Sequence, residues 1–291
     1  MRKTFDIPSS IGPFKRYLGH PSTMKYGYLY VATLALPFAP RRKVYVWLPG
    51  DYSFAGKKDY PVMYMSDGQN MVDKYLTKFG DWHLDRVVRG LRKEGYREPI
   101  LVGVASPSKS MRRGNELNPP YVPDDVHSEF YPKEPIGDQF VDSVVNIIKP
   151  LVESLFHVDK RQEATAIGGS SMGGIMAFYA FLRYPKVFGF SLSFSTPFFF
   201  YKEETLHHII DEHQPNTDNG CRLYFYVGGK DFESIFTKGV FEAREYLENK
   251  YGFTEEFLGF DYEEEAIHHE EAWYRHSDQA FRFWLSALPK E

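Results

Sequence analysis

The chain has 291 residues, 43% of them hydrophobic, which is enough to bury a substantial core in one large α/β domain. A net charge of −4 gives no electrostatic reason to expect nucleic acid or a membrane as partner, and no apolar run approaches the roughly 20 residues of a membrane-spanning helix. The start, Met1–Pro8, lacks the apolar region of a signal peptide, and the single cysteine, Cys221, favours a reducing compartment, so we expect a cytoplasmic protein.

Residues 1–42 are expected to form an N-terminal extension in which the β-prone run 28–36 can supply an edge strand. Residues 43–291 are expected to form the main domain. It opens with buried strands predicted at 43–48, 60–65 and 99–105 and a helix at 81–95. The proline-containing loop 106–135 is long for a compact domain, which is typical of a lid or another functional segment.

The second half continues the alternation of helices and strands. Asp138 is a candidate cap for a helix that runs to Leu155 and is kinked at Pro150. Strands follow at 163–167, 187–194, 221–227 and 257–262, with helices at 175–182 and 234–251 and at the C-terminus. This alternation predicts a mostly parallel sheet with helices on both faces.

The most informative stretch is Gly169-Ser170-Ser171-Met172-Gly173, between the strand at 163–167 and the apolar helix. It fits the G-x-S-x-G pattern of a nucleophile elbow with Ser171 at its centre. The glycines two residues to either side relieve the clash that bulky side chains would cause in so sharp a turn. A phosphate-binding loop would need Gly-Lys-Ser/Thr at its end, which is absent here.

Ligands of open α/β sheets lie beyond the carboxyl ends of the strands. The candidate side chains there follow the chain order serine, acid, histidine, which is typical of α/β-hydrolases. Ser171 comes first, then Asp231 or Glu233, then His268 or His269. A serine hydroxyl becomes a nucleophile when an imidazole takes its proton, and an acid holds that imidazole in the right tautomer.

Two further groups of residues have expected roles. Attack on an ester creates an oxyanion, and its backbone N–H donors are expected on Met172 and on Gln69, in the turn after an earlier strand. Phe198, Phe199 and Tyr201 follow another strand end and either wall an acyl pocket or pack in the core.

The remaining polar clusters have simpler interpretations. A loop-fixing ion pair is expected among Arg112, Arg113 and Glu116. His207, His208 and His213 lack the spacing of a zinc-binding helix, so neither a metal nor a cofactor is expected.

Four motifs together resemble the putative-esterase family, which groups feruloyl and acetyl-xylan esterases, enterochelin-type trilactone esterases, esterase D and the mycolyltransferases. They are Asp67-Gly68-Gln69-Asn70, Arg113-Gly114-Asn115-Glu116-Leu117-Asn118-Pro119, Gly169-Ser170-Ser171-Met172-Gly173-Gly174 and His268-His269-Glu270-Glu271-Ala272-Trp273. The similarity runs from about residue 43 to residue 288.

The resemblance implies an α/β-hydrolase fold with Ser171 as nucleophile and His268 as base. Asp231 is the better positional match for the acid, with Glu233 as the alternative. Family members often carry a small or amide residue after the histidine, and His269 stands there in this sequence, so the choice between the two histidines stays open.

The expected function is therefore a serine carboxylesterase acting on a sugar-linked, aromatic-acyl or short-acyl ester. The enzymatic alternatives are an acyltransferase that passes the acyl group to a sugar or alcohol and a siderophore trilactone esterase. A ligand-binding protein on a hydrolase scaffold is the non-enzymatic alternative.

Overall fold

The computed structural model describes residues 7–18, 24–107, 109–121, 132 and 134–290. The start of the chain, to which the signal-peptide argument applied, and residues 108, 122–131 and 133 of the expected lid lie outside these described residues. The strands are β1 (Ser10–Ile11), β2 (Phe14–Tyr17), β3 (Tyr28–Leu36), β4 (Ala39–Leu48), β5 (Val62–Ser66), β6 (Ile100–Val104), β7 (Thr165–Ser170), β8 (Phe190–Phe194), β9 (Arg222–Gly228) and β10 (Leu258–Glu263).

All of these strands join one sheet in the order β1-β2-β3-β4-β6-β5-β7-β8-β9-β10. The strands from β6 to β10 in this order are parallel, whereas β1 to β4 form an antiparallel meander that pairs with β6. The run 28–36 is indeed a strand, but it lies inside the sheet, and β4 crosses the expected boundary at residue 42. The division of the chain at that residue stays a prediction.

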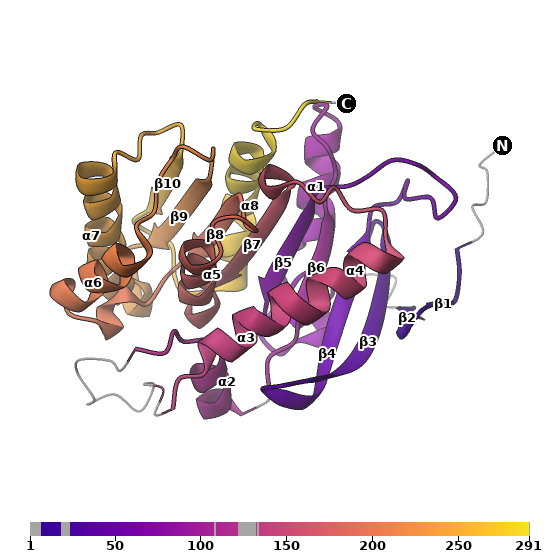
Figure 1. Cartoon of the computed structure of the whole chain (residues 1–291), viewed down its shortest axis with the longest axis horizontal. Helices are drawn as coiled ribbons and strands as arrows, with labels where there is room; N and C mark the ends of the chain where they lie inside the picture. Colours follow the sequence, from indigo (N-terminus) through magenta and orange to yellow (C-terminus); the bar gives the residue numbers. More distant parts are fainter. Residues whose placement is uncertain (1–6, 19–23, 108, 122–131, 133, 291) are drawn as a thin grey trace.

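Helices cover both faces of the sheet (Figure 1). They are α1 (Leu84–Arg92), α2 (Ser110–Glu116), α3 (Gly137–Ser143), α4 (Lys149–Leu155), α5 (Met172–Arg183), α6 (Glu203–His213), α7 (Ser234–Tyr251) and α8 (Glu270–Leu285). The helices α1 and α8 share one hydrophobic cluster with one face of the sheet, and α3 to α7 pack on the other face. This is the α/β-hydrolase fold, as the sequence predicted.

The helix expected from Asp138 to Leu155 is interrupted differently from the prediction. Asp138 lies in the first turn of α3, where its charge suits the helix dipole, and Ile136 occupies the cap position. A π-helical segment, Val144–Ile148, separates α3 from α4. Pro150 then lies near the start of α4, directly after the π-helical segment.

The apolar helix α5 is buried along nearly its whole length, because the sheet lies on one side of it and α3 and α6 on the other. A helix without a polar face needs such a central position. Among the described helices, none combines the length and the apolarity needed to cross a membrane.

Candidate active site

Ser171 occupies the tight turn between β7 and α5. Its backbone has φ 55° and ψ −128°, a combination that a non-glycine residue adopts only when its surroundings hold it there. The Ser171 N–H donates to the carbonyl of Phe194 in β8 at 2.9 Å, and the Ser171 carbonyl accepts from the N–H of Gly174 at 2.8 Å. Two neighbouring elements therefore fix a strained turn with a partly exposed serine at its tip.

The two glycines of the elbow leave room for a third residue, Ser66, at the end of β5. A Cβ on Gly169 would lie 2.3 Å from the Ser66 Oγ, and a Cβ on Gly173 would lie 2.2 Å from the same atom. A Cβ on Gly169 would also lie 2.6 Å from the backbone oxygen of Gly173, so packing requires a glycine at position 169. A Cβ on Gly173 would meet mainly the Ser66 hydroxyl, which can rotate away.

His268 lies in the loop between β10 and α8, with a side chain that is only 17% exposed. Its Nδ1 is 2.5 Å from the Oε2 of Glu233. The ring stacks on Phe236 at 4.6 Å between centroids and meets the indole of Trp273 edge-on at 5.0 Å. Since Nδ1 is engaged by the carboxylate, Nε2 is the ring nitrogen left for proton transfer.

Glu233 is fully buried and holds three partners. Besides His268, its Oε1 accepts from the Ser195 hydroxyl at 2.5 Å and from the N–H of Gly228 at 2.9 Å. The Ser195 oxygen in turn accepts from the indole N–H of Trp273 at 2.8 Å. The carboxylate is therefore held by groups on β9, on the segment after β8 and on the loop before α8, and α8 supports it only through the Trp273–Ser195 bond.

The structure corrects the expectation that Asp231 is the partner of the histidine. Asp231 has φ 53° and is exposed at the start of the 3₁₀ turn η6 (Asp231–Glu233), which carries Glu233 inward beneath the end of β9. Of the two candidate histidines, His268 is the one that contacts Glu233. His269 is exposed and caps α8, where its Nδ1 accepts from the N–H of Glu271 at 3.1 Å.

On the other side of Ser171, the 3₁₀ turn η1 (Gly68–Asn70) follows β5. The positive φ of this turn lies at Asp67, and Gly68 is needed for close packing, because a Cβ there would lie 2.3 Å from the carbonyl carbon of Gly103. The Gln69 side chain accepts from the N–H of Ser106 at 3.1 Å, which fixes the turn against the end of β6.

Asp67 and Arg113 form a bidentate ion pair, with nitrogen–oxygen distances of 2.9 and 2.7 Å. Burial favours the neutral acid, but the guanidinium outweighs it and holds the pKa of Asp67 below its usual value. The expected loop-fixing ion pair is formed by Arg112 and Glu116 at 3.0 Å, whereas Arg113 reaches this turn instead.

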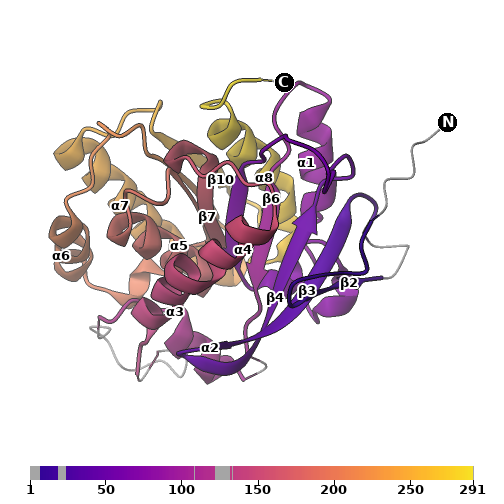
Figure 2. The ribbon, with the colours of Figure 1, turned by 45° about the vertical axis from the view of Figure 1, so that its right-hand side comes forward.

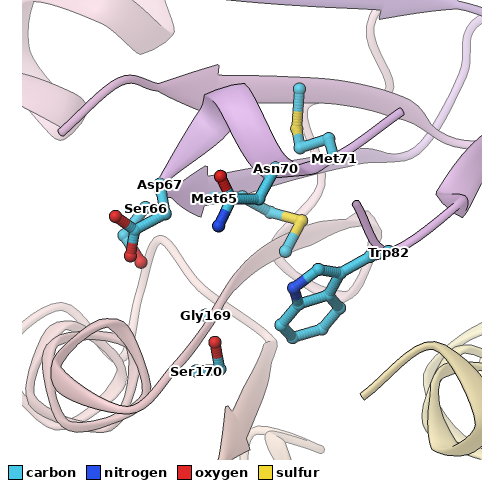
Figure 3. Close-up of a pocket in the computed structure, with 8 residues that line it drawn as sticks. All are labelled: Met65, Ser66, Asp67, Asn70, Met71, Trp82, Gly169 and Ser170. Carbon is cyan, nitrogen blue, oxygen red and sulfur yellow. The ribbon is translucent and has the colours of Figure 1, made fainter. Parts of the chain in front are cut away.

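The turn is also tied to the histidine loop. The Asn70 side chain donates to the Oε1 of Glu270 at 3.3 Å, and Glu270 is only two residues after His268. Burial, together with the negative charge of Asp67, raises the pKa of Glu270 to about 7. A cavity of about 10 Å³, room for one water molecule, lies beside this turn. Figure 3 shows its lining: Met65, Ser66, Asp67, Asn70, Met71, Trp82, Gly169 and Ser170.

Comparison with known families assigns the chain. A family model described as "Putative esterase" matches residues 38–286, most of the sequence. The chain belongs to the putative-esterase family. This esterase is therefore an enzyme that hydrolyses carboxylic ester bonds.

The relatives of this esterase are distant in sequence. The uncharacterized protein YbbA of Bacillus subtilis (strain 168) is 24% identical over 238 residues, which cover 79% of this chain and 87% of YbbA. A ferulic acid esterase superposes with a TM-score of 0.66 at 16% identity, covering 89% of this chain and 98% of that one. The siderophore hydrolase EstB of Aspergillus nidulans gives 0.66 at 18% identity, with 90% and 96% covered. At such identities, the superpositions show a shared fold.

The aromatic residues after β8 have different environments in this esterase. Phe198 and Tyr201 are buried in the core beneath α5 and α7, where both line a small cavity of about 10 Å³. Phe199 is half-buried and meets Phe236 edge-on at 5.0 Å, which connects it to the ring that stacks on His268.

Two polar residues of the site had no predicted role. Ser195 and Trp273 link Glu233 to α8, although the sequence showed only that Ser195 follows a strand end and that Trp273 belongs to the final motif. A hydroxyl directly after a parallel strand was the available signal for Ser195.

Proposed function

We propose that this protein is a serine carboxylesterase that works through an acyl-enzyme on Ser171. The observation that carries the proposal is the buried Glu233–His268 pair, 2.5 Å apart, on the sheet edge where the strained Ser171 turn lies. An imidazole held at Nδ1 by a carboxylate, with Nε2 left over, is the arrangement that activates a serine hydroxyl.

In the proposed reaction, the Ser171 Oγ attacks the carbonyl carbon of the ester while His268 Nε2 takes the hydroxyl proton. The tetrahedral intermediate collapses, the bond to the alcohol oxygen breaks, and His268 returns its proton to the departing alcohol. Water then attacks the acyl-serine with the same histidine as base, releasing the acid and restoring the Ser171 hydroxyl. Glu233 stabilises the imidazolium that forms in each half.

The oxyanion is proposed to accept from the backbone N–H groups of Met172 and Gln69. Met172 is the first residue of α5, and the first N–H groups of a helix have no partner within it. The dipole of this helix adds partial positive charge at the same point. The Ser106–Gln69 and Arg113–Asp67 contacts support the turn that carries the second donor.

The proposed substrates are short-acyl, aromatic-acyl or sugar-linked esters. Phe199 and the exposed ring of Phe232 lie on the His268 side of the site and offer apolar surface to an acyl group or an aromatic alcohol. The buried Phe236 packs behind both rings. We also propose a cytoplasmic location, supported by the lone Cys221, which is buried and whose pKa burial raises to about 11.

The test is the Ser171→Ala variant. It is expected to abolish hydrolysis of p-nitrophenyl butyrate and labelling by a fluorophosphonate probe, because no other group can form the acyl-enzyme. Ser170→Ala, which alters the adjacent hydroxyl, is the matched control and should keep the label on Ser171. Labelling of the Ser171→Ala variant at wild-type level would refute the assignment.

A further inference from the structure

A second and larger cavity, of about 380 Å³, lies beyond β6 on the same edge of the sheet. This volume is within the range of small-molecule sites, about 300–1,000 Å³. Four of its lining residues are cationic: Arg41, Arg42, Lys43 and Arg112. The others are Pro40, at the start of β4, and Ala105, Ser106 and Pro107, just after β6. No carboxylate is among these lining residues.

The positive charge of this cavity is only partly neutralised. Arg42, only 4% exposed, donates to the Ala105 carbonyl at 2.6 Å and to Glu116 at 2.8 Å, and Arg112 uses the same carboxylate at 3.0 Å. Within the described residues, the buried Arg42 Nε–H has no acceptor, and neither Arg41 nor Lys43 pairs with an acid.

One further acid, Asp67, is paired elsewhere. Arg113 donates two hydrogen bonds to it, and its attraction for Arg42 is weaker than that of Glu116. A buried guanidinium donor without an acceptor, next to unpaired surface cations, is an arrangement that an anion would complete.

The cavity adjoins the candidate active site. Ser106 lines it, and the N–H of the same residue holds Gln69 in the proposed oxyanion turn. In the sheet, β6 is separated from β7 only by β5, so the cavity begins about 10 Å from the Ser171 strand. Figures 1 and 2 both show α2 beside the β3–β4 hairpin at this edge.

We propose that this cavity binds an anionic group of the substrate, a carboxylate or a phosphate carried about 10–15 Å from the scissile ester, two to three strand spacings away. The inference rests on the proposed function and adds a substrate class to it. Arginine is suited to this task because its planar fork of N–H donors matches both anions bidentately. Arg41, Arg42, Lys43 and Arg112 act here as binding residues and take no part in the bond-breaking steps.

The experiment compares paired substrates on the wild-type protein. One series consists of p-nitrophenyl monoesters of succinic, adipic, suberic and sebacic acids, and its partner consists of p-nitrophenyl esters of the monocarboxylic acids of equal length. The ratio of kcat/KM between anionic and neutral partners should rise with chain length and exceed one for the longer pairs. It should fall towards one at high salt, since exposed charges are screened.

A parallel series uses acyl chains that end in a phosphonate in place of the carboxylate. Whichever anion gives the higher ratio of kcat/KM to that of the neutral ester is the anion that the cavity prefers.

The variant Arg41→Gln/Lys43→Gln should lower this ratio about three- to tenfold, mainly through KM, as expected for two partly exposed ion pairs. Lys160→Gln/Lys186→Gln removes the same charge from exposed positions that precede β7 and β8, at the opposite edge, and should leave the ratio unchanged.

A ratio at or below one for every length, or one that the Arg41/Lys43 variant does not change, would overturn the anion site while ester hydrolysis itself stands. Failure to hydrolyse any ester, neutral ones included, would overturn the proposed function and this inference with it.

Discussion

Two hydrogen-bond networks flank Ser171, and they are built from different chemistry. On the histidine side, the fully buried Glu233 is held by a serine hydroxyl, a backbone N–H and an imidazole. On the oxyanion side, Asp67 is held mainly by the guanidinium of Arg113, and the two side chains keep 12% and 25% exposure.

The difference matches the two tasks proposed for the two sides of the site. Dipolar donors in a water-excluded pocket fix the direction of an imidazole and respond little to salt. The Asp67–Arg113 ion pair lies near water and beside Glu270, which titrates near pH 7. The net charge on this side of the site therefore changes with pH, and its interactions weaken as the ionic strength rises. We therefore expect substitutions on the histidine side to act on the chemical step and those on the oxyanion side to act through pH.

The largest effect is expected for Glu233→Gln. The amide keeps the shape of the side chain but removes the charge that stabilises the imidazolium and selects its tautomer. The kcat/KM for p-nitrophenyl butyrate should fall about 10³- to 10⁴-fold. Circular dichroism should show an unchanged fold.

Asp231→Asn is the matched control, two residues away in the same 3₁₀ turn. Because Asp231 is exposed, the kcat/KM of the Asp231→Asn variant should stay within about twofold of the wild-type value, as for surface substitutions in general. Equal losses of activity in the two variants would contradict the prediction that Glu233, and not Asp231, supports His268 in catalysis.

An intermediate effect is expected for Ser195→Ala. The change removes one donor to Glu233 and leaves the buried indole N–H of Trp273 without its acceptor. Unfolding by urea should show a loss of about 1–3 kcal/mol, and kcat/KM should fall about tenfold. Ser234→Ala, whose hydroxyl donates to the Asp231 carbonyl on the surface, should cost little. A neutral outcome at Ser195 would mean that Glu233 does not need this support.

The effect expected at Glu270 is confined to stability and appears as a pH dependence. Its pKa in the folded protein is about 7, above the usual value of 4.5, so the folded state binds more protons between these two pH values. The contribution of protonated Glu270 to the free energy of unfolding is fully present below about pH 4.5. It is lost as the pH rises through 7. Glu270→Gln should therefore become more stable relative to wild type as the pH rises from 5 to 8, by about 1–3 kcal/mol.

Glu98, whose pKa burial also raises to about 7, adds a loss of the same sign in both proteins. The difference between the two urea-unfolding profiles therefore isolates Glu270. Parallel profiles across this pH range would show that Glu270 does not titrate where its environment implies.

The sequence was sufficient for the elbow because its geometry is local. The spacing of Gly169, Ser171 and Gly173 between a strand and an apolar helix defines a turn whose constraints lie within a few residues. The mostly parallel sheet followed from the alternation of strands and helices, whereas the order of its strands was not predicted. Likewise, His268 was recognisable from the motif that precedes α8.

The sequence did not distinguish Asp231 from Glu233 as the partner of the histidine. Both residues lie in one 3₁₀ turn, and only the fold shows that the turn directs Glu233 into the protein and Asp231 toward solvent. That direction depends on the positive φ of Asp231 and on donors contributed by Ser195 and Gly228. Phe198 and Tyr201 were ambiguous for a similar reason, since only the packing of α7 shows that they are core. The short helix α2 gave too little periodicity to be predicted within a loop.

The contact between Ser66, Gly169 and Gly173 has a consequence for how such an enzyme can evolve. A side chain at Gly169 would meet the backbone oxygen of Gly173 as well as the Ser66 hydroxyl, so single substitutions of Gly169 are expected to be lost by selection. Arg41, Lys43 and Phe232 are exposed and carry no such constraint. New substrate preferences can therefore arise by point mutation around the rim, while the elbow is inherited unchanged.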